Sequence, residues 1–262
     1  MSQVRSAFNK ASSQYDEHAF LQKEIAVRLD AKLDVISGTS KVILDLGAGT
    51  GLLSTQLTKR FPDSQIVCLD FAQASLKHNP SKHKLCANAY QLPLADNSVD
   101  MVISSLMMQW CPDLKQLFSE IHRVLKNDGL ILFSTFGPDT LKELKKSWSV
   151  VDSEAHVNTF TDMHDIGDQM LGAGFQSPVM EMEKLTLTYQ TVTDLLRDLK
   201  AIGAQTVSTR SKSLMGKGKF KLMTQMYESY RQDGKLPASY EVIYGHAWKR
   251  TSSLGAIEIN NS

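Results

Sequence analysis

The sequence predicts an α/β fold, a mostly parallel β-sheet with helices on both faces. Strand and helix patterns alternate over more than 90 residues, from Lys41 to Thr135, which is typical of such sheets. One of these strands runs straight into a glycine-rich turn that opens a helix. The chain has 262 residues, of which 42% are apolar and 22% charged, so it can bury one sizeable core.

The N-terminal part predicts one long helix. Residues 1–12 are polar, and we expect them to be frayed. From Tyr15 onward, Leu21, Ile25, Leu29 and Leu33 recur every four residues, which places four apolar side chains on one helical face. The turn at 37–40 ends this helix.

The central part predicts five strands and the helices between them. Lys41–Leu46 is a continuous apolar run typical of a buried strand, and the glycine turn at 47–51 leads into a helix from Leu52. The later strands are expected at 66–70, 84–87, 99–104 and 130–135, with helices at 72–78 and 114–125.

Beyond Phe136 the pattern changes to helices and two further strands. Helices are expected at 140–150, 162–171, 194–202 and 220–230, and strands at 179–189 and 241–248. We therefore divide the chain into an N-terminal helical cap (1–40), a ligand-binding core (41–136), its continuation (137–190), a helical insertion or lid before the last strand (191–240), and that strand with a loose tail (241–262).

Charge and cysteine content exclude several classes of protein. There are 29 Lys and Arg against 28 Asp and Glu, a formal charge of +1, so a strongly basic nucleic-acid binder is not expected. No uncharged apolar run approaches the roughly 18 residues of a membrane span, and the start has no signal-peptide core. The three cysteines lack CxxC spacing, which favours a reducing compartment and no thiolate metal site. We expect a cytoplasmic protein without a metal.

Polar residues gather at the predicted strand ends. Asp45, Asp70, Asn88 and Ser104 each end or follow a strand, and ligands of parallel sheets bind at this edge. Glycines in the 47–51 turn let the backbone approach a ligand closely, and a carboxylate such as Asp70 can accept from both ribose hydroxyls. The turn has GxGxG spacing, not the GxGxxG of dinucleotide sites, so an NAD site is the weaker alternative.

The segment Asp45-Leu-Gly-Ala-Gly-Thr-Gly51 resembles motif I of the class I S-adenosylmethionine-dependent methyltransferases. The resemblance implies a Rossmann-like, seven-stranded sheet, a glycine loop against the methionine part of the cofactor, and Asp70 on its ribose. Asn88-Ala89 matches the adenine-edge motif, although many relatives carry Asp there. The expected S-adenosylmethionine-binding residues are Tyr15, Gln22, Asp45, Gly47, Gly49, Gly51, Asp70, Phe71, Asn88, Ala89 and Ser104.

Further segments of the sequence narrow the class of substrate. Residues 104–110 lack the Asn/Asp-Pro-Pro-aromatic motif of amine and nucleobase methyltransferases. The chain resembles the malonyl-[acyl-carrier-protein] O-methyltransferases of biotin synthesis in Phe8, Tyr15-Asp-Glu-His-Ala19, Gln22, Phe136-Gly-Pro-Asp-Thr-Leu-Lys-Glu-Leu144, His164-Asp-Ile-Gly-Asp168, 198–204 and 236–248. This resemblance implies methylation of the free carboxylate of malonyl on acyl carrier protein, which primes pimeloyl synthesis. Another small-molecule methyltransferase, for a quinone or a free carboxylic acid, is the alternative, and a non-catalytic scaffold is a second one.

A carboxylate acceptor needs little help from side chains. It is ionised at pH 7, and alignment alone can supply on the order of 7–11 kcal/mol, so we expect no catalytic acid or base. The substrate-positioning candidates are Tyr15, His18, Trp110, His164, Arg197 and Lys200. Residues 197–221 carry a local excess of basic residues, which predicts docking of an acidic carrier protein through Arg210, Lys212, Lys217, Lys219 and Lys221.

Overall fold

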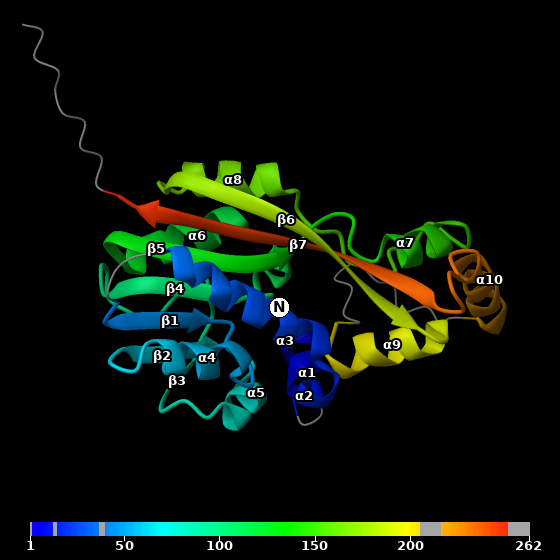
Figure 1. Cartoon of the computed structure of the whole chain (residues 1–262), viewed down its shortest axis with the longest axis horizontal. Helices are drawn as coiled ribbons and strands as arrows, with labels where there is room; N and C mark the ends of the chain where they lie inside the picture. The colour runs from blue at the N-terminus through cyan, green and yellow to red at the C-terminus, as the bar shows by residue number, and fades with distance from the viewer. Residues whose placement is uncertain (1, 13–14, 37–39, 205–215, 251–262) are drawn as a thin grey trace, which may run out of the picture.

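The computed structural model describes residues 2–12, 15–36, 40–204 and 216–250. Within these ranges, seven strands form one sheet in the order β3-β2-β1-β4-β5-β7-β6 (Figure 1). The strands are β1 (Val42–Leu46), β2 (Gln65–Asp70), β3 (His83–Cys86), β4 (Val99–Ser105), β5 (Leu125–Phe136), β6 (Gln176–Tyr189) and β7 (Leu236–Lys249). The first five are parallel to one another, while β7 runs antiparallel to both of its neighbours. The predicted fold class is confirmed.

Helices cover both faces of this sheet. The described α-helices are α1 (Ser2–Ala11), α2 (Tyr15–His18), α3 (Phe20–Ala31), α4 (Leu52–Arg60), α5 (Gln73–His78), α6 (Leu114–Val124), α7 (Lys142–Ser149), α8 (Met163–Gly172), α9 (Val192–Ala201) and α10 (Lys217–Glu228). Short 3-10 helices lie at Lys32–Val35 (η1) and Met108–Trp110 (η2). The helical insertion expected before the last strand is present as α9 and α10.

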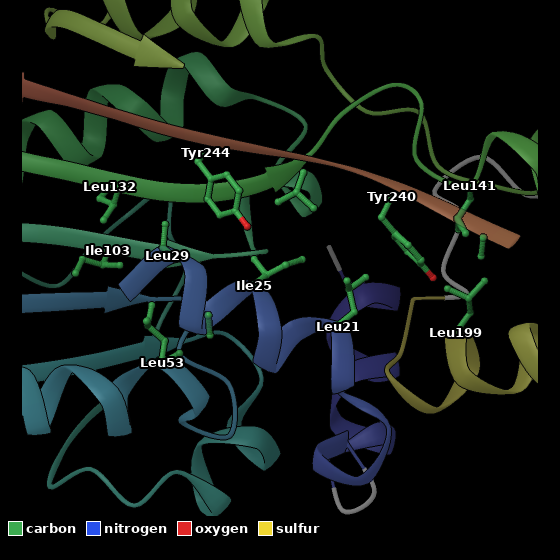
Figure 2. Packing of buried hydrophobic residues seen from close by; sticks show 14 of the residues in the cluster. Leu21, Ile25, Leu29, Leu53, Ile103, Leu132, Leu141, Leu199, Tyr240 and Tyr244 are labelled. Atoms are coloured by element: carbon green, nitrogen blue, oxygen red, sulfur yellow. The ribbon is translucent and has the colours of Figure 1, made fainter. Parts of the chain in front are cut away.

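Alternation along β1 separates two apolar cores. Ile43 belongs to the core shared with α3 and α4, whereas Leu44 and Leu46 belong to the core shared with α6 and α8. Successive side chains of a strand point to opposite faces, so a strand buried on both faces reads as a continuous apolar run. Figure 2 shows Leu29 of α3 beside Ile103 and Leu132 of the sheet, with Ile25 further along the same helix.

Strands β6 and β7 extend beyond the other strands. Helices α7, α9 and α10 gather around their far ends, away from the parallel part of the sheet (Figure 1). Tyr240 of β7 lies there near Leu141 and Leu199 (Figure 2). This extension builds a second apolar layer beside the edge at which the parallel strands end.

Several local expectations were wrong; β5, for example, starts at Leu125 instead of Leu130. Residues 2–11 form α1 instead of a frayed end, because Val4 and Ala11 are buried and Phe8 packs on other aromatic rings. The single helix expected from Tyr15 is broken at Ala19, which has non-helical backbone angles. The last strand starts at Leu236 instead of Glu241, because residues 236–240 pair with β6. Among the described residues, no helix is long and apolar enough to cross a membrane.

Candidate active site

The glycine turn between β1 and α4 forms the floor of a cleft. Gly47 and Gly49 both have positive φ angles, +82° and +52°, a region that glycine enters without steric cost. A Cβ atom at Gly47 would lie 2.4 Å from the Met107 side chain, whereas one at Gly49 would meet nothing within 4 Å. Gly47 is therefore required by packing, and Gly49 leaves open space in the cleft.

Asp70 fastens this turn from the end of β2. Its Oδ2 accepts from the Gly49 backbone N–H at 2.9 Å, and its Oδ1 accepts from that of Ala72 at 2.7 Å. Burial raises the pKa of Asp70, which these two bonds partly offset. A carboxylate has about four acceptor sites, so two remain for a ligand.

The cleft has the size and lining of a small-molecule site. It holds about 770 Å³, part of it open to solvent, within the roughly 300–1,000 Å³ typical of such sites. Its lining comes from the glycine turn, the ends of β2, β3 and β4, and the N-terminal helices: Phe8, Tyr15, Leu46, Gly47, Gly49, Thr50, Leu69, Asp70, Phe71, Ser75, Ala87, Asn88, Ala89, Ser105, Leu106, Met107, Trp110 and Cys111.

A side recess of the cleft contains acceptor atoms. It shares Tyr15 and Gly49 with the cleft and is also lined by Gln22 and Asp45. Oε1 of Gln22 is buried and has no hydrogen-bond partner, which costs free energy unless a ligand donates to it. Asp45 accepts from the Ser54 hydroxyl, and burial raises the pKa of Asp45 to about 7. A cationic ligand group would satisfy both acceptors.

Helices α1 and α2 close over the cleft. The Thr50 hydroxyl donates to Asp16 at 2.7 Å, and the Ala74 N–H donates to Asn9 Oδ1 at 3.0 Å. The Phe8 ring meets Trp110 edge-on, with 5.3 Å between centroids. Burial, with the charges of Asp70 and Asp16, raises the pKa of Tyr15, so Tyr15 remains a neutral phenol at pH 7 and cannot act as a base.

A second cavity adjoins the cleft. It encloses about 900 Å³, again partly open, and Trp110 borders both spaces. Its walls are mainly apolar and come from α3, η2, β5, α7, the segment after α7, α9 and β7. They are Gln22, Gln109, Trp110, Phe136, Thr140, Leu141, Leu144, Trp148, His156, Val157, Asn158, Phe160, Leu196, Leu199, Ile202, Ala204 and Tyr240. A molecule placed here would approach a ligand of the cleft at Trp110.

Comparison with known proteins assigns the chain to a family. A family model described as a methyltransferase domain matches residues 44–133. A malonyl-[acyl-carrier protein] O-methyltransferase of Gallionella capsiferriformans is 47% identical, over 99% of this chain and 95% of the relative. Another from Methylovorus sp. is 45% identical, over 94% and 88%. The chain belongs to the malonyl-[acyl-carrier protein] O-methyltransferase family.

Among solved structures, the YcgJ protein of Bacillus subtilis superposes with a TM-score of 0.60 at 16% identity, over 85% of this chain and 98% of that one. This likeness shows the fold alone. The geometry of the cleft in this chain also fits S-adenosylmethionine. Gly49 leaves open space in the cleft, and the recess offers the Asp45 carboxylate and the unpartnered Gln22 oxygen to a methionine ammonium.

Most residues predicted for the cofactor lie together. Tyr15, Gly47, Gly49, Asp70, Phe71, Asn88 and Ala89 line the cleft, and Gln22 and Asp45 line the recess. Gly51 lines neither space and is instead required by packing of the turn, because a Cβ atom there would lie 2.8 Å from the Pro80 side chain. Ser104 is buried, and its hydroxyl donates to the Leu46 carbonyl at 2.7 Å. Ser105, one position on, lines the cleft.

The residues predicted for substrate positioning are dispersed. Trp110 lies between the two cavities. His18 instead pairs with Asp198 of α9 at 3.2 Å. The exposed His164 and Arg197 pair with Asp162 and Asp194, and the Lys200 side chain is also exposed. Along α9, Leu196 and Leu199 face the second cavity, whereas Arg197 and Lys200 are absent from its lining.

The expected docking residues lie only partly in the described ranges. Lys217, Lys219 and Lys221 are exposed on α10, and Lys219 pairs with Asp152 at 2.9 Å. Arg210 and Lys212 fall outside the described residues. Within those residues, no group of three or more His, Cys, Asp or Glu side chains could hold a metal ion.

Several lining residues were missed at the sequence level. Phe8 was expected in a frayed segment, although its place in the family motif was a signal. Trp148 and His156 lie far from the glycine motif in sequence. Their ring centroids are 3.8 Å apart, and the two rings are nearly parallel.

Proposed function

We propose that this chain transfers a methyl group from S-adenosylmethionine to the free carboxylate of a malonyl group carried on acyl carrier protein. The product, a malonyl methyl ester, would prime pimeloyl synthesis for biotin. The observation that carries the proposal is the meeting of the two cavities at Trp110. One cavity suits a nucleoside cofactor, and the other presents mainly apolar walls to an acyl thioester. The names of the relatives support the same reaction.

When bound, S-adenosylmethionine would supply an activated methyl group to a carboxylate oxygen of the substrate, and the electron pair of its S–CH₃ bond would stay on sulfur. No proton moves, which agrees with Tyr15 as a neutral phenol. The protein has three tasks. Asp70 holds the glycine turn in shape, α1 and α2 cover the cleft, and the rings of Phe8 and Trp110 form part of its wall. Alignment of the carboxylate oxygen with the methyl group then accounts for the rate.

The proposed partner is acidic, and α10 offers it a basic face. Lys217 and Lys221 are exposed one turn apart, so both can approach acidic side chains of a carrier protein. Electrostatic docking of this kind raises the association rate and weakens with salt. We place the reaction in the cytoplasm, which agrees with the three cysteines being free thiols.

Methyl transfer is tested directly with labelled S-adenosylmethionine and malonyl-carrier protein. We expect the label in a base-labile ester on the carrier. Acetyl-carrier protein, which lacks the free carboxylate, should receive none and serves as the control. Absence of transfer to malonyl thioesters, with cofactor binding intact, would reject the proposed substrate and retain the fold.

Docking is tested with the double variant Lys217→Glu/Lys221→Glu. We expect KM for malonyl-carrier protein to rise about tenfold or more at low salt, while kcat and KM for the cofactor stay unchanged. The difference should shrink as salt rises, because screening removes the attraction that the variant has lost. Lys59→Glu/Lys77→Glu, on α4 and α5, makes the same charge change elsewhere and should leave KM unaltered. Equal effects of both double variants would contradict docking at α10.

A further inference from the structure

The second cavity contains one side chain with unusual surroundings. Among the described residues that line it, His156 is the only one whose side chain can carry a positive charge. The side chain is 8% exposed, and its ring stacks on Trp148 with an interplanar angle of 11°. Lys145 lies near the wall, 5.1 Å from the Phe160 centroid, but its ammonium donates to the Pro138 carbonyl.

His156 begins a chain of alternating charges. Its Nε2 lies 2.8 Å from Asp152 Oδ1, and Lys219 Nζ lies 2.9 Å from Asp152 Oδ2. Hydrogen bonds from Lys219 and His156 lower the pKa of Asp152 to about 2, so Asp152 is an acceptor at neutral pH. Nε2 must therefore carry the hydrogen, which leaves Nδ1 for another partner.

Lys219 changes what this arrangement can bind. A histidine and an aspartate alone would form a neutral pair once the imidazole is protonated. Because Lys219 already balances the Asp152 charge, protonation of Nδ1 gives the trio a net charge of +1 beside a mainly apolar cavity. An anionic ligand group pays a high desolvation cost in such a cavity unless it meets a charged donor.

We infer that His156 recognises the carboxylate of the acyl substrate in the second cavity, with Nδ1–H donating to one carboxylate oxygen. This inference rests on the proposed function. A single N–H donor holds one oxygen and leaves the other available to the methyl group. A bidentate guanidinium would engage both oxygens, and no Arg or Lys is among the described lining residues.

The test compares two ligands that differ only in the carboxylate. Binding of malonyl-carrier and acetyl-carrier protein is measured by calorimetry with S-adenosylhomocysteine present, so that no methyl transfer can occur. We expect the wild type to bind the malonyl form at least tenfold more tightly. His156→Phe retains a ring against Trp148 but has no donor, and the preference should fall to about onefold, with acetyl binding unchanged.

Two further variants keep the test decisive. Lys219→Met retains the imidazole but removes the charge that balances Asp152, so the malonyl preference should fall at least threefold. His83→Gln, an exposed change on β3, is the matched control and should retain the full preference. Affinity for S-adenosylhomocysteine reports whether each variant is folded.

The outcomes separate this inference from the proposed function. If His156→Phe weakens both thioesters equally, or retains the malonyl preference, His156 is structural and the inference is wrong, even if the wild type methylates malonyl-carrier protein. If a folded wild type neither prefers nor methylates the malonyl thioester, the proposed function itself fails.

Discussion

At the scale of single residues, we expect Asp45 to link the stability of the fold to cofactor binding. Burial raises its pKa from 3.8 to about 7, so the folded state binds more protons than the unfolded state between these values. The stability that this protonation contributes is complete below pH 4 and is lost as pH rises through 7. A cationic methionine ammonium in the recess would favour the ionised form, so cofactor affinity should increase from pH 5.5 to 7.5.

Asp45→Asn removes this titration and retains an acceptor for Ser54. We expect the ligand-free variant to be more stable than the wild type by about 2–4 kcal/mol at pH 8 and nearly equal at pH 4.5, as measured by urea unfolding. Its affinity for S-adenosylhomocysteine should fall at least tenfold at pH 8 and lose its pH dependence. A stability difference that is the same at both pH values would contradict the assignment.

The glycines of the turn make a matched pair. Gly47→Ala places a methyl group against Met107 in a positive-φ conformation, and we expect about 2–4 kcal/mol of destabilisation. Gly49→Ala has the φ strain without the collision, about 1–2 kcal/mol, but its methyl group projects into open space of the cleft. It should remain folded and bind S-adenosylhomocysteine at least tenfold more weakly.

Thermal unfolding and calorimetry on the two glycine variants check this division. Gly172→Ala, at the end of α8 with nothing within 4 Å of the added methyl group, is the control. It should leave S-adenosylhomocysteine affinity unchanged and raise stability by at most about 1 kcal/mol. Normal cofactor affinity in Gly49→Ala would show that the ligand does not approach this turn.

At the scale of elements, α1 acts as a cover for the cleft. Phe8 reaches Phe71 and Trp110 with centroid distances of 6.4 and 5.3 Å, and it lines the cleft directly. Phe8→Ala removes both aromatic contacts, each worth about 0.5–1.5 kcal/mol beyond its area. We expect about a tenfold loss of S-adenosylhomocysteine affinity, mainly through faster dissociation, with little change in global stability. Arg5→Ala, an exposed change on α1, should have no effect on stopped-flow dissociation rates.

The elements also show what sequence patterns can and cannot predict. Asp45, the glycine turn and Asp70 lie at or directly after the ends of β1 and β2. Strand periodicity and sheet topology together therefore predict that they share one edge of the sheet. Ser104 illustrates the limit. Successive side chains of a strand point to opposite faces, so the prediction of Ser104 instead of its neighbour Ser105 selected a side chain that points away from the cleft. The second cavity brings Gln22, Trp110, His156 and Tyr240 together from distant segments, and no local pattern predicts that convergence.

At the scale of the whole molecule, the two cavities are lined mainly by different parts of the chain. The cleft is lined by residues before position 112, whereas most walls of the second cavity follow position 135. Gln22, Gln109 and Trp110 are the exceptions, since they belong to the first part and line the second cavity. A cofactor bound in the cleft would thus form part of the boundary of the second cavity, where we propose that the acyl group binds.

The charge of the cleft also distinguishes its cofactor from NAD. Asp70 faces the turn and Asp45 lies in the recess, so two acids oppose a diphosphate and favour an ammonium. S-adenosylhomocysteine at 100 times its Kd should stabilise the fold by about 2.7 kcal/mol, which corresponds to a rise in Tm of about 5–10 °C. NAD at the same concentration should leave Tm unchanged, and the Phe8→Ala variant should show a smaller rise with S-adenosylhomocysteine. An equal shift with NAD would mean that the turn tolerates a diphosphate, and the assignment of the recess to the methionine end would be wrong.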